Sequence, residues 1–599
     1  MALLLAVAIA AAAAGAKEGE PTTTLVSQGA GGKGGDAASV EPVVSGDGRF
    51  VVFASRAKNL SPAAKSGKQH IYAREMKTGT VTLVSRADGA GGAAADGDSF
   101  EPSISADGRY VAFRSSAENL SAEDTDSSDV FVRDLAAGTT TLVSRASGPA
   151  GAAGEGESTD PSISADGRHV AFVSYANNLV ADDEKSIHTD VFVRDLDTGA
   201  TELISRADGA AGAASAEYSF EPSISADGRY VAFASRGQLV ADDVDDLPQD
   251  VFVRDRAAGK TILVSRKSGA TGEPSGSESD EPAISADGRH VAFVSTAKLT
   301  GQRSFDVNVF VRDLDAETVE LVSVGDEGRA GDGKRRPSIS ADGRYVAFQT
   351  RGNGLSPVDA EGRVDVFVRD MQQGLTVTVS RASGRLGAPA DGPSYNGSVS
   401  ADGSVVAFDS HATNFSAADA DRFADVFLRR PVYAKEPRLP ECAGRIATII
   451  GTSGRDSLRG TKRKDIVVAL GGDDRIRTFS GGDRICAGAG RDLVETGTNG
   501  SGGGFDLVFA GPGADRVELD RELGTANGQG GNDLLLGSKG GDSLRGGPGD
   551  DVLRGGDNPP FNTDFLYGGP GNDKLYGGPG PNNLTGGPGR DVEVRDTTE

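Results

Sequence analysis

The chain has 599 residues, of which 85 are glycine, none is tryptophan and only 6% are aromatic. This composition excludes an ordinary large helical or doubly wound enzyme and favours a protein built from repeats. The formal net charge of −25 repels nucleic acid and anionic lipid, so we expect no nucleic-acid partner and no membrane insertion. The same charge attracts divalent cations, and a metal ion is therefore the first partner to expect.

The N-terminal segment is apolar. Its hydrophobic run ends in Ala14, Gly15 and Ala16, before the charged Lys17, which predicts a secretory signal peptide over residues 1–16. No basic residue precedes the run, so an uncleaved anchor is the alternative, although the run is short for a membrane span. No lipid-anchor motif follows, and we expect a secreted or extracellular protein that associates at most loosely with the cell surface.

A short string recurs along the first two thirds of the chain. It reads SADGRYVAF at Ser105–Phe113, and its copies are about 60 residues apart. Seven copies are marked by Asp47, Asp107, Asp166, Asp227, Asp287, Asp342 and Asp402. Each repeat contains four short segments with alternating apolar residues, such as PSIS, RYVAF, DVFVRD and TTLVS, which predict four antiparallel strands. We expect the Asp-Gly pair to form a two-residue hairpin turn between the first two strands.

Four strands per repeat are typical of a propeller blade. The repeats resemble those of WD-like, Tol-type propellers, whose recurring core is PSxSxDGxxxAF, and this resemblance implies a seven-bladed four-stranded β-propeller over residues 22–430. TTTLVS at Thr22–Ser27 is a last-strand sequence with no blade before it, whereas the seventh repeat stops at Asp425–Arg430 without a last strand. We therefore expect the N-terminal strand to complete blade seven.

Acidic residues gather in the loops between the second and third strands of the blades. Oxygen ligands at alternate loop positions could wrap a hard cation such as calcium. The spacing and the number of acids differ between the repeats, however, and this variation favours solvated acidic turns. The residues are Asp124, Asp126, Asp129, Asp182, Asp183, Asp190, Asp242, Asp243, Asp245, Asp246, Asp250, Asp359, Glu361, Asp365, Asp419, Asp421 and Asp425.

Motifs for nucleophilic catalysis are missing from the sequence. There is no GxSxG elbow, and the five histidines, His70, His169, His188, His290 and His411, are scattered rather than spaced as metal ligands. We predict no catalytic residue, and an enzyme is the less favoured class. A pair of carboxylates facing one cleft would still suffice for glycoside hydrolysis.

A second kind of repeat follows a proline-containing linker at residues 431–441. Aspartate recurs there at about nine-residue intervals, with an apolar residue such as Leu458 or Val467 two places later. The clearest unit is GGPGDD at Gly546–Asp551. These features resemble the hemolysin-type, or repeats-in-toxin (RTX), nonapeptide GGxGxDxUx, which implies a parallel β-roll over residues 442–599 that binds Ca²⁺ as its cofactor. A disordered glycine-rich linker is the alternative, but it would not keep the apolar position.

The spacing of these aspartates has a physical reason. One unit makes a glycine turn and a short strand, two units complete a coil, and carboxylates two units apart face each other, where calcium would bridge them. Asp465 follows three basic residues and Asn582 replaces an aspartate, so we expect weak binding or none at both places. The residues expected to bind calcium are Asp456, Asp474, Asp483, Asp492, Asp515, Asp533, Asp542, Asp551, Asp573 and Asp591.

Cys442 and Cys486 are the only cysteines. In an exported protein a disulfide between them is favoured over two free thiols, and it would join the cap of the roll to its third coil. The sequence thus predicts an all-β, two-domain calcium-binding protein whose propeller presents a binding face for a cell-surface glycan or protein. An extracellular hydrolase of glycan or peptide, with carboxylates on a propeller face, is one alternative. A calcium-dependent structural surface protein is another.

Overall fold

The chain forms two compact units that divide near residue 436, and all their regular structure is β-strand. Among the described residues no helix is long and apolar enough to cross a membrane. The expected signal peptide and residues 432–439 of the expected linker lie outside the described residues. The computed structural model describes residues 20–595 apart from 30, 65–66, 90, 124–126, 149–150, 182–186, 210–211, 242, 244–248, 270, 302–306, 326–334, 352–354, 357–362, 385–386, 420, 432–439, 498–504, 521–522 and 560.

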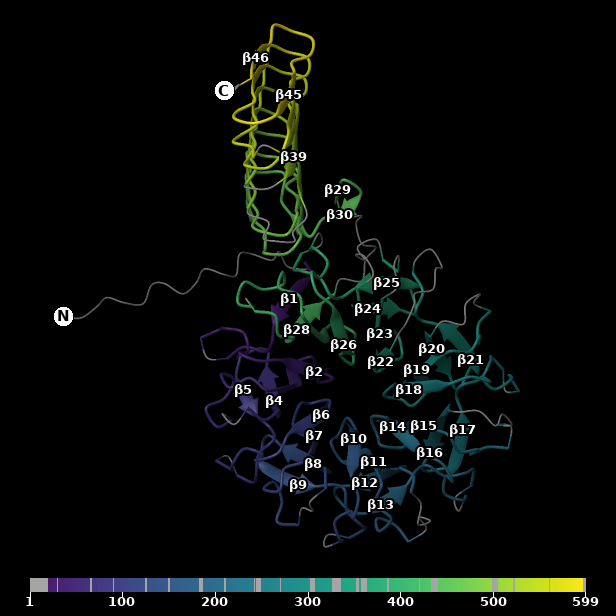
Figure 1. The fold of residues 1–599 in the computed structure, drawn as a ribbon. Helices are drawn as coiled ribbons and strands as arrows, with labels where there is room; N and C mark the ends of the chain where they lie inside the picture. Colours follow the sequence, from purple (N-terminus) through teal and green to yellow (C-terminus); the bar gives the residue numbers. More distant parts are fainter. Residues whose placement is uncertain are drawn as a thin grey trace, which may run out of the picture. The chain divides into compact units, whose positions relative to one another are not determined.

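The first unit is a ring of seven four-stranded antiparallel sheets, each of which is one blade (Figure 1). Blades one to three comprise β2 (Ser39–Val44), β3 (Phe50–Ser55), β4 (His70–Glu75), β5 (Val81–Leu83), β6 (Ser99–Ile104), β7 (Tyr110–Ser115), β8 (Asp129–Asp134), β9 (Thr139–Leu142), β10 (Ser158–Ile163), β11 (His169–Ser174), β12 (Asp190–Asp195) and β13 (Thr201–Leu203). Blades four to seven comprise β14 (Ser219–Ile224), β15 (Tyr230–Ser235), β16 (Asp250–Asp255), β17 (Lys260–Leu263), β18 (Ser279–Ile284), β19 (His290–Ser295), β20 (Asn308–Asp313), β21 (Thr318–Leu321), β22 (Arg335–Ile339), β23 (Tyr345–Thr350), β24 (Asp365–Asp370), β25 (Leu375–Thr378), β26 (Ser394–Val399), β27 (Val406–Ser410), β28 (Asp425–Arg430) and β1 (Thr22–Leu25). The predicted propeller of seven blades is confirmed.

Neighbouring blades pack face to face, because successive side chains of a strand point to opposite faces of its sheet. In blade two, the rings of Phe113 and Phe131 stack with centroids 5.9 Å apart and share a buried cluster with Ile71 of blade one. Ala112, which directly precedes Phe113 in the same strand, belongs instead to the cluster shared with Phe172 of blade three. The VAF and DVF segments therefore supply both faces of every blade with apolar side chains.

The ring is closed by its N-terminal strand, as the sequence predicted. Strand β1 pairs antiparallel with β28, from Thr22 opposite Arg430 to Leu25 opposite Phe427. The buried guanidinium of Arg429 donates hydrogen bonds to Thr23 Oγ1 at 2.7 Å and to the carbonyl oxygen of residue 382 at 2.9 Å. The first and last strands of the propeller thus form one blade.

The predicted two-residue Asp-Gly hairpin is wrong. The first two strands of blade two are joined by residues 105–109, in which only Gly108 has a positive φ, of 76°. The Asp107 carboxylate instead accepts hydrogen bonds from Ser105 Oγ (2.7 Å) and from the Arg109 N–H (2.9 Å), so it holds a longer turn together. In the next blade the ring of Tyr110 lies directly against the equivalent Gly167, where any Cβ would collide with it. The glycine therefore serves blade packing as well as the turn.

The second unit is a β-solenoid of two parallel eight-stranded sheets. A hairpin of β29 (Glu441–Cys442) and β30 (Arg445–Ile446) precedes them. One sheet contains β31 (Ile449–Ile450), β33 (Ile466–Val468), β35 (Arg484–Cys486), β37 (Asp506–Pro512), β39 (Gly524–Gly530), β41 (Ser543–Arg545), β43 (Asp564–Tyr567) and β45 (Asn582–Thr585). The other contains β32 (Ser457–Arg459), β34 (Arg475–Arg477), β36 (Leu493–Glu495), β38 (Arg516–Glu518), β40 (Leu534–Leu536), β42 (Val552–Arg554), β44 (Lys574–Tyr576) and β46 (Val592–Val594).

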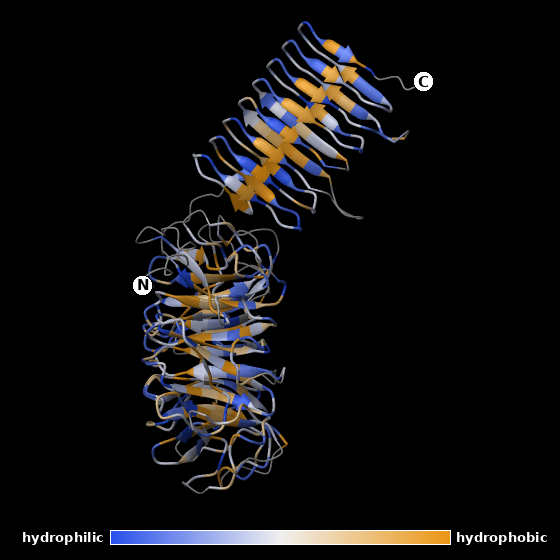
Figure 2. Cartoon of the chain, turned by 90° about the vertical axis from the view of Figure 1, so that its left-hand side faces the viewer, coloured by the Kyte–Doolittle hydropathy of each residue, from blue (hydrophilic) through white to orange (hydrophobic). Residues whose placement is uncertain are grey.

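Each coil of the solenoid contributes one strand to each sheet, and hydrophobic residues stack along both (Figure 2). Leu535 pairs with Leu553 and Leu553 with Leu575, one coil further on each time. All three are fully buried in one core cluster. The predicted apolar position two places after each aspartate is thus the core of the coil.

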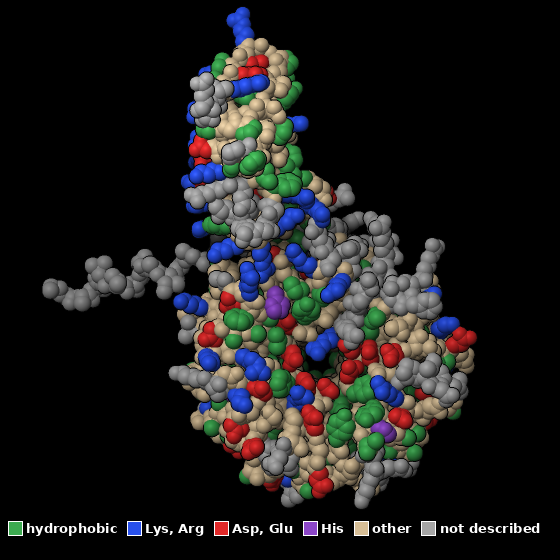
Figure 3. Space-filling model, in the orientation of Figure 1, with side chains coloured by type: hydrophobic (Ala, Val, Ile, Leu, Met, Phe, Trp, Pro, Cys, Tyr) green, Lys and Arg blue, Asp and Glu red, His purple; other side chains and the backbone are tan. Residues whose placement is uncertain are grey.

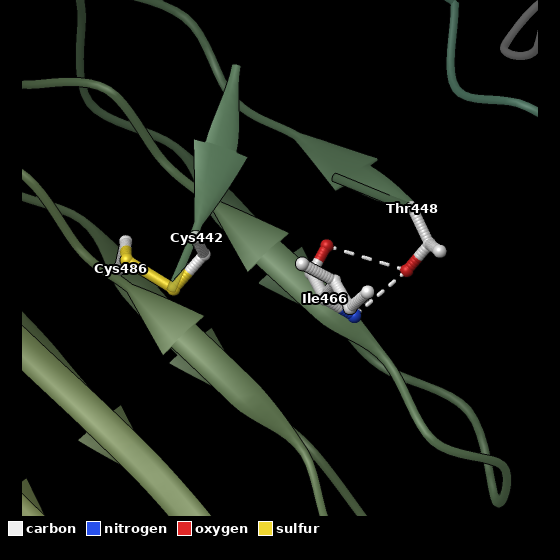
Figure 4. The surroundings of a disulfide bond; sticks show 4 residues. All are labelled: Cys442, Thr448, Ile466 and Cys486. Atoms are coloured by element: carbon white, nitrogen blue, oxygen red, sulfur yellow. Dashed lines mark hydrogen bonds between the residues drawn. A yellow bond between two sulfur atoms is a disulfide. The ribbon is translucent and has the colours of Figure 1, made fainter. Parts of the chain in front are cut away.

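A disulfide joins Cys442 of the hairpin to Cys486 of the third coil, with Cα atoms 5.7 Å apart (Figure 4). The predicted pairing is confirmed. Beside it, Thr448 Oγ1 accepts a hydrogen bond from the Ile466 N–H at 2.8 Å. Cys442 packs with Ile466 and Val468, which alternate along their strand with the core residue Val467, so the hairpin covers the outer face of this sheet.

The closing strand gives a direct test of the ring. Leu25 is 2% exposed and packs on Phe427, so Leu25→Ala should lower the free energy of unfolding of the propeller by about 2–5 kcal/mol. Thr24→Ala, on the exposed side of the same strand, should change it by less than about 0.5 kcal/mol. Calorimetric unfolding of the full chain measures both. A Leu25→Ala protein with wild-type unfolding would contradict the closure.

Candidate functional site

The aspartates of the solenoid form two columns, in which each residue is hydrogen-bonded to its counterpart in the next coil. The N–H of Asp533 donates to Asp551 Oδ1 at 2.8 Å, and the N–H of Asp551 donates to Asp573 Oδ1 at 2.9 Å. The first column consists of Asp456, Asp474, Asp492, Asp515, Asp533, Asp551, Asp573 and Asp591. The second column contains Asp465, Asp483, Asp506, Asp542 and Asp564, with Gly524 at the place of one aspartate.

All ten residues predicted to bind calcium lie in these columns, eight in the first and two, Asp483 and Asp542, in the second. The prediction left out Asp506 and Asp564, which follow longer connections than the other aspartates. The apolar residues two places after them, Val508 and Leu566, were the signal that could have included them.

Most of these aspartates have one carboxylate oxygen without a partner. The other oxygen accepts the N–H of the preceding coil, whereas Oδ2 is buried and has no hydrogen bond. The residues are Asp474, Asp483, Asp492, Asp515, Asp533, Asp551, Asp564 and Asp573. Native proteins rarely leave a buried carboxylate oxygen unpaired, because its desolvation costs several kcal/mol. The columns therefore lack a positively charged partner for these oxygens.

Three aspartates of the columns are satisfied locally instead. Oδ2 of Asp456 accepts the N–H of Thr452, and Oδ2 of Asp542 accepts the N–H of Ser538, both at 2.6 Å. Thr461 makes the same contact with Asp465. In each case a hydroxyl residue stands four places before the aspartate, and the oxygen that is free elsewhere is engaged. These positions have the least need of a metal.

The electrostatics of the columns follow from burial. Removal from water, together with the charges of Asp533 and Asp573, raises the pKa of Asp551 to about 7 against the lowering effect of the hydrogen bond that it accepts. Burial likewise raises the pKa of Asp483 and Asp515 to about 7. The columns thus resist taking on their full negative charge unless a cation compensates it.

The glycines of the turns leave room for that cation. A Cβ on Gly546 would collide with Asp551 Oδ2 and with the carbonyl oxygen of Gly568, so both oxygens face the same small space. Gly568 has the same relation to Asp573 and to the carbonyl of Gly586. Carboxylate and carbonyl oxygens are the ligands that calcium prefers, in a flexible shell of six to eight. These residues therefore fit calcium, which would neutralise the facing carboxylates.

The sequence of the solenoid matches a known family. The model of the RTX calcium-binding nonapeptide repeat (4 copies) matches residues 459–494, 527–558 and 562–593. These segments are RTX calcium-binding repeats. Of the ten predicted ligands, all except Asp456 and Asp515 fall within the matched segments. No curated protein is significantly similar in sequence to the chain.

Several solved propeller structures are similar to the chain at low sequence identity. Oligogalacturonate lyase in complex with manganese is 15% identical with a TM-score of 0.42, over 69% of this chain and 98% of that one. TolB from Acinetobacter baumannii is 16% identical with a TM-score of 0.32, over 58% and 65% of the two chains. The β-propeller domain of the Trilobed protease from Pyrococcus furiosus is 14% identical with a TM-score of 0.41, over 66% and 98%.

A ring of acidic residues surrounds the central channel of the propeller, where Figure 3 shows an opening with acidic side chains gathered around it. The first strand of every blade has a bulge at which one residue other than glycine takes a positive φ of 50–55°. These residues are Glu41, Glu101, Asp160, Glu221, Glu281, Arg336 and Asn396. The sequence analysis did not single them out, although in most blades they directly precede the proline or glycine of the first strand.

The acids of this ring link successive blades. Glu41 Oε2 accepts the N–H of Glu101 at 3.0 Å, and Glu101 Oε2 accepts the N–H of Asp160 at 2.9 Å. Glu221 Oε2 accepts the N–H of Glu281 at 2.7 Å. In these pairs the bulge directs an N–H at the carboxylate of the preceding blade, and burial raises the pKa of Glu101 and of Glu221 to about 7.

The acidic loops of the propeller are described only in part. Asp124, Asp126, Asp182, Asp183, Asp242, Asp245, Asp246, Asp359 and Glu361 lie outside the described residues. In five blades the third strand begins with an aspartate, which accepts the hydroxyl of the serine two residues after the fourth strand. Examples are Asp129 with Ser144 and Asp190 with Ser205, both at 2.6 Å.

The shared space beside Gly546 can be tested with a single methyl group. Gly546→Ala should raise the calcium concentration at the midpoint of solenoid folding by about tenfold, because the new Cβ occupies the space between the ligand oxygens. Gly530→Ala makes the same change where nothing lies within 4 Å and should leave the midpoint unchanged. Calcium titration of the full chain by far-UV circular dichroism measures both. Equal midpoints for the two variants would refute the site.

The acidic ring predicts a pH dependence. Because the pKa of Glu221 is raised from 4.5 to about 7, its contribution to stability is full below about pH 4.5 and is lost as the pH rises through about 7. Glu221→Gln keeps an oxygen for the N–H of Glu281 but cannot ionise. We expect it to raise the melting temperature of the propeller at about pH 8 and to leave it unchanged near pH 4.5.

The control for this variant is Glu155→Gln, at an exposed position of blade three. It should follow the wild type at both pH values in the same calorimetric scans. A Glu221→Gln protein that also follows the wild type at about pH 8 would show that the carboxylate is not destabilised by burial.

Proposed function

We propose that this chain is an exported protein whose solenoid folds around calcium outside the cell and whose propeller binds a partner at the cell surface. The observation that carries the proposal is the set of eight buried aspartate oxygens without a hydrogen-bond partner. The match of the same segments to RTX calcium-binding repeats supports it. Such repeats are typical of secreted proteins, which is consistent with the signal peptide expected from the sequence.

Calcium would act on the solenoid as a folding ligand. Without it, the unpaired oxygens of Asp533 and Asp551 and their neighbours are buried next to one another, and the glycine-rich turns lose much backbone entropy on ordering. A ligand that binds only the folded state stabilises it by RT ln(1 + [L]/Kd). Extracellular calcium modules have Kd values of about 10⁻⁴–10⁻³ M, so export would bring the chain to the concentration at which the solenoid folds.

The propeller is the proposed binding module. A cavity of about 750 Å³ beside Ser147 and Arg206 recurs one blade further, beside Asp208 and Arg266, with about 880 Å³. Surfaces that repeat from blade to blade favour an extended ligand, such as a glycan or protein, over a small substrate in one unique cleft. The acidic ring at the channel favours a ligand that carries positive charge.

One observation supports an extracellular hydrolase as the second candidate. Glu101 has a pKa raised to about 7 and lies beside Asp160, whose pKa burial also raises. A carboxylate that stays protonated near neutral pH can act as a general acid, and a second one can act as nucleophile or base. Hydrolysis of a glycan or peptide by the full chain, lost in Glu101→Gln, would favour this candidate over the binding module.

Calcium-dependent folding can be tested on the full chain by limited proteolysis. We expect residues from about 451 to 591 to be cleaved in excess chelator and protected in millimolar calcium, because calcium compensates the buried carboxylates. Magnesium, which demands octahedral geometry, should not protect them. Full protection in chelator would overturn the proposal.

A matched pair of variants assigns the effect to the columns. Asp551→Asn keeps an oxygen for the N–H of Asp533 but removes the charge, so it should need about tenfold more calcium for protection and be no less resistant than the wild type in chelator. Asp557→Asn makes the same change at an exposed position and should behave as the wild type. Identical calcium requirements for the two variants would contradict a role for the column.

A further inference from the structure

Three aspartates come together in blade seven of the propeller. Carboxylate oxygens of Asp419, Asp421 and Asp425 lie within 4.8 Å of one another, and no other such group occurs in the described part of the chain. Asp425 is fully buried and Asp419 is 4% exposed. Acidic clusters on protein surfaces are common and solvated, and burial sets this cluster apart from them.

Two oxygens of the cluster have no hydrogen-bond partner. Asp425 Oδ2 and Asp419 Oδ1 are buried and unpaired, whereas Asp425 Oδ1 accepts the hydroxyl of Ser27. The strongest charges acting on Asp419 are those of Asp425, Asp421 and Asp391, all of which are acidic. Burial and these charges raise the pKa of Asp419 to about 7. The cluster, like the aspartate columns of the solenoid, thus buries carboxylate oxygens that have no hydrogen-bond donor.

Other blades show that the negative charge of Asp425 is not needed to hold the fourth strand. In blade five Ser323, two residues after the fourth strand, donates its hydroxyl to Asn308 Oδ1 at 3.1 Å. In blade four Asp250 Oδ1 is paired with two hydroxyls, those of Ser265 and Ser275. A neutral side chain can therefore make the contact with the fourth strand, and a buried aspartate can be satisfied without a metal. Neither arrangement accounts for the free oxygen of Asp425.

The cluster lies where the two ends of the propeller chain meet. Ser27 lies two residues after strand β1, and the N–H of Gly34 donates to the carbonyl oxygen of Ala418 at 3.1 Å. A side chain on Gly34 would come within 3.6 Å of Asp425 Oδ2, so this segment covers the cluster closely. Strands β1 and β28 lie side by side in Figure 1. An ion in the cluster would join the N-terminal segment to the loop before β28.

We propose that Asp419, Asp421 and Asp425 bind a calcium ion that locks the propeller ring at blade seven. Two carboxylates at alternate loop positions, together with one at the start of a strand, supply oxygen ligands only, as a hard cation requires. Calcium tolerates an irregular shell completed by carbonyl oxygens or water, whereas magnesium does not. The site is separate from the RTX repeats, and it stands whether or not the proposed function of the solenoid holds.

The test is hydrogen exchange of the full chain, followed by mass spectrometry, in calcium and in chelator. In the wild type, calcium should slow exchange at residues 22–39 and 411–430 by at least tenfold, because the ion opposes opening of the seam. In Asp421→Asn/Asp425→Asn calcium should have no effect on these segments. In chelator the double variant should exchange no faster than the wild type, because an asparagine at 425 still accepts the Ser27 hydroxyl, as Asn308 does in blade five.

Two controls keep the outcome decisive. Asp250→Asn makes the same change at the same strand position of blade four and should leave the calcium effect at blade seven intact. If the double variant does not fold, Asp421→Asn alone, at a half-buried position, should at least weaken the effect. The proposal is overturned if calcium leaves both segments unchanged in the wild type, or if it protects them equally in the double variant. It is also overturned if magnesium at the same concentration protects them as well as calcium does.

Discussion

Buried carboxylate oxygens without a hydrogen-bond donor are the constraint on which the solenoid depends. In each aspartate column the backbone of one coil engages one oxygen of the next aspartate, as between Asp533 and Asp551, and leaves the other oxygen facing a glycine turn. Among the described residues the glycines place no side chain in that space. A cation with oxygen ligands removes the desolvation cost and the repulsion at once. We therefore propose that folding of the solenoid and binding of calcium are one process.

The propeller handles its repeated acids differently. The carboxylate of Glu41 accepts the N–H of Glu101, and that of Glu101 accepts the N–H of Asp160, so these acids link adjacent blades through backbone hydrogen bonds. Packing between the blades then rests on apolar faces such as Phe113 and Phe131. The described first unit is thus held together by hydrophobic packing and hydrogen bonds, whereas the second buries carboxylate oxygens that we propose calcium neutralises.

The architecture could be predicted from the sequence because apolar residues recur at a fixed spacing in both kinds of repeat. The spacing of VAF and DVF segments gave seven blades, and the residue two places after each aspartate gave the solenoid core. The orphan TTTLVS gave the closing strand. The prediction went wrong at the Asp-Gly turn, because the Asp107 side chain stabilises a longer connection that dipeptide statistics do not show.

Other features of the candidate sites depend on individual contacts, which the spacing of the repeats does not predict. Asp456 and Asp551 occupy equivalent repeat positions. Oδ2 of Asp456 nevertheless accepts the N–H of Thr452, whereas Oδ2 of Asp551 has no hydrogen-bond donor. The blade-seven cluster is completed by Ser27, almost the whole length of the propeller away in sequence. The acidic ring arises from a bulge whose positive φ is visible only in the folded strand. Such sites depend on which individual oxygen atoms have hydrogen-bond partners, and only the folded structure determines this.

The most direct test of this account is the position of the ion itself. Crystals grown with calcium and measured for anomalous scattering should show difference peaks beside the glycine turns, between oxygens such as Asp551 Oδ2 and the carbonyl of Gly568. Peaks should be weakest where a hydroxyl residue already satisfies the aspartate, as at Asp456. A well-ordered solenoid without peaks in the columns, or with peaks only on its outer surface, would contradict the account.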